Sequence, residues 1–142
     1  MEIFSTIITG VIVYVLGQLT LKLVIEPIQE LKKEIQQTLA DCSFYWGIVT
    51  NMPDVKEELI KEASITFRKR STSLRSKVAI IPFLDFFADL KILPTHNNLS
   101  EASSRLMGIS NLSVTKGNRE DNMTNFKWLQ EAESFLNPKV NQ

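Results

Sequence analysis

The residues best suited to bind a ligand are five cations within positions 63–84. This stretch contains no acid, so its net charge is +5, whereas residues 26–62 hold eight acids and four lysines, net −4. On a helix the five cations form a collar around its axis. They can pair with the acidic stretch, or they can bind anionic lipid headgroups or a phosphorylated ligand. The collar comprises Arg68, Lys69, Arg70, Arg75 and Lys77.

Nucleic acid is the least favoured partner for this collar, because the whole chain carries 16 basic and 16 acidic residues. Residue patterns typical of catalysis are also missing. The five glycines are too scattered for a dinucleotide fingerprint or a phosphate loop, and His96 has no Cys, Asp or Glu beside it. The single Cys42 lies on an apolar stripe, where a thiol is inert. We therefore expect no metal site, no cofactor and no enzymatic activity.

Residues 4–25 predict a transmembrane helix. This segment contains no acid, and at about 1.5 Å per residue it spans roughly 33 Å, enough for a hydrocarbon core of about 30 Å. Its only charge is Lys22, which lies near its end and can extend its ammonium to the headgroups. A cleaved signal peptide fits less well, because Glu2 precedes the apolar stretch and no small-residue cleavage site follows it.

The basic residues around the span predict its orientation. Lys22, Lys32 and Lys33 all lie at or beyond its C-terminal end, and no basic residue precedes it. Because positive charge stays on the cytoplasmic side, we expect the N-terminus outside a bacterial inner membrane. Residues 1–25 would then be the anchor, and residues 26–142 a cytosolic domain.

Small residues within the span predict that it associates with another helix. Gly10 and Gly17 are seven residues apart and share one stripe with Tyr14 and Leu21, with Gln18 at its edge. Small residues allow close approach in lipid, and a buried amide adds hydrogen bonding. We expect a homo-oligomer, or pairing with a membrane partner protein, through this stripe.

The cytosolic residues predict an all-α fold, an antiparallel bundle of about four helices, because apolar residues recur at three-and-four spacing. A first helix over residues 27–49 has Pro27 at its start, as the opening of a new helix or as a kink. Its seam packs on the rest of the domain or on a second copy, and Glu34 is expected in solvent. The expected seam comprises Ile28, Leu31, Ile35, Thr38 or Leu39, Cys42, Tyr45 or Trp46, and Val49.

Capping signals predict where the later helices begin. Asp54 with Glu57 forms a capping box for a second helix, and Asn98 with Glu101 forms one for a third main helix. Their expected buried residues are Leu59 or Ile60, Ala63, Phe67, Leu74 and Val78 in the second, and Leu99, Ala102, Leu106 and Ile109 in the third.

Two further segments are less regular. Pro82 and Pro94 bracket a short buried helix around residues 83–90, for which a piece lying on the membrane surface is the alternative. After an exposed loop at residues 113–122, a last helix is expected over residues 122–136, with Trp128 exposed and Pro138 ending it. Its expected inward residues are Phe126, Leu129, Ala132 and Leu136.

Several of these motifs together resemble a family of small, uncharacterised bacterial proteins with a single membrane anchor. The motifs are E-P-I-Q-E-L-K-K at residues 26–33, Leu74-Arg75, Pro94, Asn98, Glu101-Ala102 and L-M-G-I-S-N at residues 106–111. The similarity covers roughly residues 7–112. It implies one anchor and a cytosolic helical domain, and it brings no catalytic activity, cofactor or substrate.

The sequence therefore predicts a membrane-anchored helical module for interaction or sensing. A bacterial antiviral defence effector, oligomeric in the membrane and gated by a partner or an anionic ligand, would have this layout. The alternative is a passive membrane anchor or a scaffold subunit of a larger complex.

Overall fold

The computed structural model describes residues 2–51, 54–114 and 119–137, and no β-strand occurs among them. The predicted all-α class is therefore confirmed for this part of the chain. The elements are α1 (Glu2–Thr20), a π-helical turn η1 (Leu21–Ile25), α2 (Glu26–Thr50), α3 (Glu57–Ala79), α4 (Leu84–Asp89), α5 (His96–Val114) and α6 (Arg119–Leu136).

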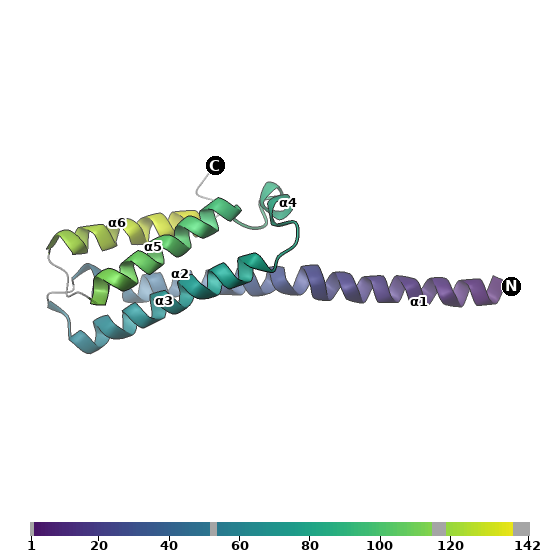
Figure 1. Ribbon diagram of the computed structural model, residues 1–142, viewed down its shortest axis with the longest axis horizontal. Helices are drawn as coiled ribbons and strands as arrows, with labels where there is room; N and C mark the ends of the chain where they lie inside the picture. Colours follow the sequence, from purple (N-terminus) through teal and green to yellow (C-terminus); the bar gives the residue numbers. More distant parts are fainter. Residues whose placement is uncertain (1, 52–53, 115–118, 138–142) are drawn as a thin grey trace.

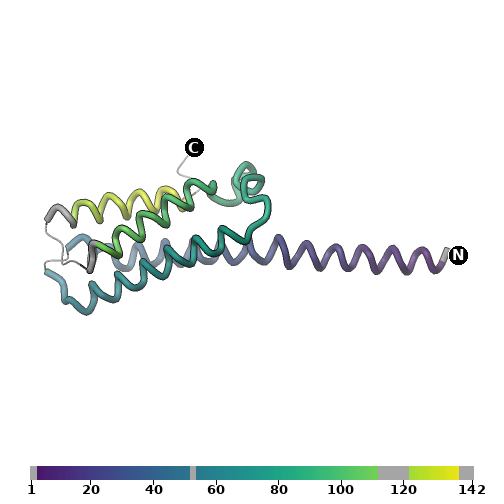
Figure 2. The backbone as a smooth tube through the Cα atoms, viewed as in Figure 1, coloured from purple at the N-terminus to yellow at the C-terminus, as the bar shows by residue number. Residues whose placement is uncertain are grey.

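The first three elements form one continuous helix, Ile3–Thr50, that extends from the rest of the molecule as a rod (Figure 2). Pro27 lacks an N–H, and its ring would crowd the carbonyl of Leu23 in a regular α-helix. The π turn η1 lies immediately before this proline, and the Glu26 N–H donates to the Leu21 carbonyl five residues back. The wider turn lets the helix pass Pro27 without interruption, so Pro27 neither opens a separate helix nor breaks one.

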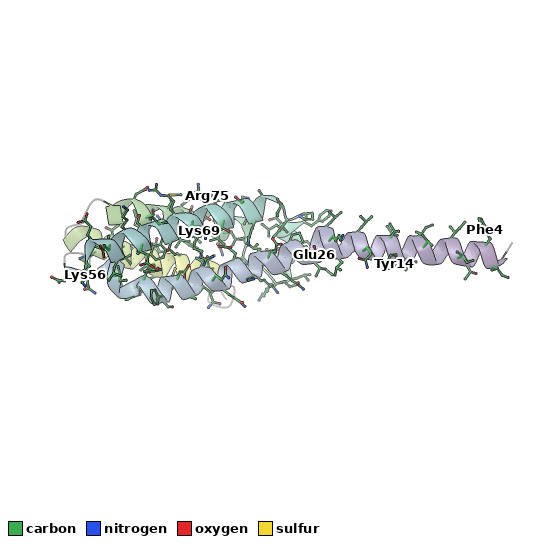
Figure 3. The ribbon with its side chains drawn as sticks, turned by 90° about the horizontal axis from the view of Figure 1, so that it is seen from below. Phe4, Tyr14, Glu26, Lys56, Lys69 and Arg75 are labelled. Carbon is green, nitrogen blue, oxygen red and sulfur yellow. The ribbon has the colours of Figure 1, made fainter. Side chains whose placement is uncertain are left out.

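The side chains of α1 project into open space around the rod, as those of Phe4 and Tyr14 show (Figure 3). The described chain has one helix that is long and apolar enough to cross a membrane, and it lies near the N-terminus. Farther along the same rod, one face of α2 is buried. The rod therefore has an unpacked apolar half and a packed amphipathic half.

The other long helices pack side by side with α2. In this arrangement α2 contacts α3 and α6, and α5 contacts the same two helices (Figure 1). Their apolar stripes meet in one core. Its largest fully buried side chains include Leu31, Phe67, Leu74, Leu106, Ile109, Leu129 and Leu136.

The seam predicted for α2 is confirmed, with Thr38 and Tyr45 chosen over Leu39 and Trp46 at the two ambiguous positions. Glu34 is a correction. Glu34 was expected in solvent but is only 4% exposed, because its side chain points at α3 and pairs with two cations there. A carboxylate is buried at this level only when such partners are present.

The stripe predicted for α3 is confirmed from Ile60 to Leu74, while Val78 is only partly buried. Its predicted capping box is wrong. Lys56 is the N-cap of α3 and has no side-chain capping bond, and the Asp54 N–H instead closes a turn onto the Asn51 carbonyl.

The N-terminus of α5 is also corrected. This helix begins at His96, and the Thr95 hydroxyl accepts the Asn98 N–H at 3.2 Å, so Thr95 replaces Asn98 as the cap. Both residue types are good caps, and the earlier start places Leu99 one turn inside the helix. The four apolar residues expected to be buried in α5 are all buried.

The short helix α4 is only partly buried, which corrects the prediction of a buried helix over residues 83–90. Leu84 is buried and Phe87 partly so, but Phe83, Phe86 and Leu90 are exposed. The six residues of α4 make fewer than two turns. The domain covers only one side of this short helix.

The last helix buries Leu129, Ala132 and Leu136 as predicted, but Phe126 is exposed and Asn125 takes its inward place. The Asn125 Nδ2 donates to the Val49 carbonyl at 3.1 Å, which satisfies the last turn of α2. The loop before α6 is shorter than predicted, because α5 continues to Val114. Its central residues 115–118 and the predicted stop at Pro138 lie outside the described residues.

Trp128 corrects the prediction of an exposed side chain. It is half-buried against the core, with its ring over Gly108 of α5. A Cβ atom at position 108 would overlap the ring carbon Cζ3 of Trp128. Gly108 therefore permits the close packing of α5 on α6, and α5 does not end there.

Candidate functional site

The basic collar of α3 divides into two groups with different partners. Arg70 and Lys77 face α2. The Arg70 Nε lies 2.6 Å from Asp41 Oδ2, and its Nη1 lies 3.0 Å from Glu34 Oε1. The Lys77 Nζ lies 3.2 Å from the other oxygen of Glu34. These two cations therefore join α3 to the acidic helix before it.

The Glu34 carboxylate is the centre of this network. Burial alone would raise its pKa, but hydrogen bonds from Ser73, Arg70 and Lys77, with the charge of Arg70, outweigh burial and hold the pKa below its ordinary value. The Glu34 carboxylate is consequently ionised at neutral pH although the residue is buried. The network stabilises the contact between α2 and α3.

The remaining cations, Arg68, Lys69 and Arg75, form an exposed surface that we call the basic ledge. Arg68 donates to Ser110 Oγ at 3.3 Å and to Asn111 Oδ1 at 3.1 Å. Arg75 donates to Ser104 Oγ at 3.3 Å. These acceptors on α5 are uncharged, and the ion pairs of the described residues include no member of the ledge. Neutral partners on α5 thus hold Arg68 and Arg75 in place.

Two shallow hollows lie along this ledge. Thr72 and Ser76 line the first, and their hydroxyls donate to backbone carbonyls one turn earlier in α3. Donors toward an anion would therefore come from the cations. The first hollow, of roughly 590 Å³, is lined by Ile65, Arg68, Lys69, Thr72, Ser73 and Ser76. The second, of roughly 420 Å³, is lined by Arg75, Val78, His96, Leu99, Ser100 and Ser103.

Pairs of buried serines hold α3 against α5 beneath the ledge. The Ser64 hydroxyl donates to the Ser110 carbonyl at 2.8 Å, and the Ser71 hydroxyl donates to the Ser103 carbonyl at 2.7 Å. Each pair of serines on one helix is seven residues apart, which is two helical turns. The sequence analysis did not predict these serine contacts. The available signal was the spacing of seven residues between serines that lie within apolar stripes.

The other candidates for chemistry lie in ordinary structural positions. Cys42 is fully buried, and burial, followed by the nearby charges of Glu133 and Asp41, raises the pKa of its thiol to about 12. The thiol is therefore protonated and shielded at neutral pH. His96 is exposed at the first turn of α5, beside Arg75 in the second hollow. No cluster of three metal-ligating side chains occurs within the described ranges.

The aromatic run of α2 contributes to two different environments. The Tyr45 hydroxyl donates to Glu62 Oε1 at 3.0 Å, and its ring meets Phe67 edge-on in the core. Trp46 instead meets Phe126 edge-on, with ring centres 5.0 Å apart. These two rings line an open hollow of roughly 670 Å³, far from the span. Its other lining residues are Thr50, Asn51, Asp54, Asn122 and Met123.

The glycine stripe of the apolar N-terminal helix has no packing partner among the residues that the structure describes. A Cβ atom at Gly10 or Gly17 would meet nothing within 4 Å, and the side chains of Tyr14, Gln18 and Leu21 are exposed. The structure thus brings together the collar residues around α3, while the stripe stands apart on α1.

Comparison with known proteins finds no match to this chain among protein-family models, curated proteins or solved structures. Any function therefore has to be argued from the residues themselves.

Proposed function

We propose that the protein is a single-pass membrane protein whose cytosolic domain, an antiparallel bundle of about four helices, is an interaction or sensing module. Its N-terminus would lie outside a bacterial inner membrane, with α1 and η1 in the bilayer. A partner or an anionic ligand would bind the basic ledge, and the span would oligomerise through its glycine stripe. An antiviral defence effector that perturbs the membrane is the specific form we favour.

The observation that supports this most strongly is the continuity of the helix Ile3–Thr50. Its α2 part is buried among α3 and α6, and its α1 part is apolar and exposed. A rotation or tilt of α2 within the domain would therefore move the span as a rigid extension. A passive anchor needs no such continuity, because a flexible linker would serve it equally well.

The ledge is the proposed input because neutral partners hold its two arginines in place, and none of its cations is ion-paired among the described residues. Arg68 and Arg75 bridge from α3 to neutral acceptors on α5, so an anion bound there would contact both helices at their junction. Arg70 and Lys77 are proposed to act structurally, since the acidic residues of α2 already bind them. The resemblance to membrane-anchored bacterial proteins is part of the same proposal.

The proposal is tested by recording membrane potential with a fluorescent dye in bacteria that overexpress the protein. Wild-type protein should depolarise the cells. Replacing Arg68, Lys69 and Arg75 together by Gln should abolish depolarisation at equal protein level, because the input surface loses its charge. A matched control replaces three exposed cations elsewhere, Lys56, Lys61 and Lys127, by Gln and should still depolarise.

Two outcomes would contradict the effector. If wild-type protein leaves the potential unchanged, the passive anchor or scaffold is the better description. If both triple variants depolarise cells like the wild type, the ledge is not the input.

A further inference from the structure

The short helix α4 and its flanking turns leave a group of large apolar side chains uncovered. Phe83 is 77% exposed, Phe86 59% and Leu90 54%, and Ile80 just before them is 60% exposed. Phe86 belongs to α4 itself, while Phe83 and Leu90 are the two residues that flank this helix. Several large apolar side chains exposed within so short a segment are uncommon on a domain surrounded by water and indicate an interaction site.

The position of α4 indicates what it meets. It lies at the end of the domain from which the rod of α1 emerges, next to α5 (Figure 1). Val24 in the last turn before α2 and Phe87 of α4 both pack against the same apolar core. If α1 and η1 cross the bilayer, α4 is therefore held at the level where the rod leaves the hydrocarbon.

The backbone is left-handed on both sides of α4. Phe83 and Lys91, on either side of α4, have φ values of 55° and 56°, in the left-handed region that bulky residues avoid. No glycine relieves either position. Lys91 is the left-handed residue of a Schellman ending, in which the Lys91 and Ile92 N–H groups donate to the Ala88 and Phe87 carbonyls. Phe83 is the strained residue that this ending does not explain, and its ring is exposed.

The net charge of this segment gives it no attraction to anionic headgroups, so apolar burial would be its only drive toward the bilayer. Asp85, Asp89 and Lys91 are exposed and give the segment a net charge of −1. The two acids lie four residues apart, and Asp89, three residues after Phe86, borders the apolar group on the same face of α4. An aromatic and aliphatic face beside charged residues is suited to the layer between headgroups and acyl chains.

We propose that α4, through Phe83, Phe86, Leu90 and Ile80, inserts into the interfacial layer of the bilayer as a second membrane contact. The inference rests on the proposed membrane anchoring of α1. Two contacts, one at the span and one at α4, fix the orientation of the domain on the membrane. A conformational change in the domain would then move both contacts relative to the lipid.

The test measures the depth of single fluorescent labels in full-length protein reconstituted into zwitterionic phosphatidylcholine vesicles. In a Cys42→Ala background, an environment-sensitive dye is placed on Cys at one of three exposed positions. Phe86→Cys reports on α4, Val13→Cys reports on the span, and Phe44→Cys is a matched exposed aromatic on the distal part of α2. Quenching by nitroxide on the lipid chains is compared with quenching by iodide in water.

We expect the dyes at positions 13 and 86 to be quenched by the lipid nitroxide and shifted to the blue, and the dye at 44 to be quenched by iodide alone. If 13 is in lipid but 86 is quenched by iodide, the inference fails and the anchor stands. If 86 is shielded from both quenchers, it faces protein and the lipid contact is overturned. If 13 is not quenched from lipid, the proposed anchor fails, and the inference with it.

Discussion

Glu34 illustrates how a single residue connects the charge pattern to the fold. Its carboxylate accepts from Arg70 and Lys77 on α3, and these partners lie 36 and 43 positions further along the chain. Removing one partner from a buried ion pair costs more than the pair contributes, because the other charge stays buried. Part of the charge of the acidic and basic stretches is therefore neutralised within the domain, without any ligand.

This network predicts a pH dependence of stability. The pKa of Glu34 is held below its ordinary value in the folded chain, so its contribution is complete above an ordinary glutamate pKa of about 4.3 and is lost as pH falls through the lowered value. Glu34→Gln should lower the free energy of unfolding at pH 7 by about 1–3 kcal/mol. The free energy of unfolding of the Glu34→Gln variant should also fall less steeply than that of the wild type as pH is lowered.

The measurement is urea unfolding of the full-length protein in mild detergent, followed by circular dichroism between pH 7 and pH 3. The control is Glu30→Gln, an exposed glutamate on the same helix, which should change neither quantity by more than about 0.5 kcal/mol. Equal curves for Glu34→Gln and the wild type would show that the network does not stabilise the domain.

Gly108 gives a second prediction at the residue scale. Gly108→Ala places a methyl group against the Trp128 ring, which must move, so we expect a loss of about 1–3 kcal/mol in the free energy of unfolding. Gly47→Ala is the matched control, because nothing lies within 4 Å of its Cβ position, and it should stabilise α2 by up to about 1 kcal/mol. The same unfolding measurement applies. A second change, Trp128→Leu, should remove most of the penalty of Gly108→Ala, and purely additive effects would contradict the clash.

The helical elements show which features of the fold can be read from the sequence. The apolar stripe of α2 was predictable, because its members recur at three-and-four spacing over several turns, whereas the buried Glu34 was not. Spacing does not predict which of two neighbouring residues is buried. Asn125 is buried and Phe126 is exposed, and their directions differ by about 100° on a helix. The members of the collar were likewise identifiable. Which of them stay unneutralised was not, because that depends on where α2 and α5 lie beside α3.

The π turn η1 carries the prediction at the element scale. Pro27→Ala restores an N–H and removes the crowding at Leu23, so residues 21–27 should return to a regular α-helix. Removing one π turn rotates the span by about 100° relative to the domain. Spin labels on Leu19→Cys and Asn97→Cys, in a Cys42→Ala background diluted with unlabelled chain, should then change their separation by on the order of 5 Å. An unchanged distance would mean that packing around Val24, and not the proline, maintains the turn.

The molecule as a whole places three surfaces along one axis: the glycine stripe of α1, the apolar face of α4 and the basic ledge of α3. Only the first lies entirely within the proposed bilayer. If the rod transmits motion, the ledge and the stripe are thermodynamically coupled, and an anion at the ledge changes association of the spans by the same factor that association changes anion binding.

The mass of the full-length protein in mild detergent tests this assembly directly. Light scattering corrected for detergent should give a discrete multiple of 16.2 kDa, because Gly10 and Gly17 leave an open stripe at which a second span can approach closely. Gly17→Leu fills that stripe and should return the mass to one chain. Val15→Leu, on the opposite side of α1, adds bulk to the same helix and should leave the multiple unchanged. A wild-type monomer would make the stripe a lipid-facing surface, and the rod would then act on the bilayer one chain at a time.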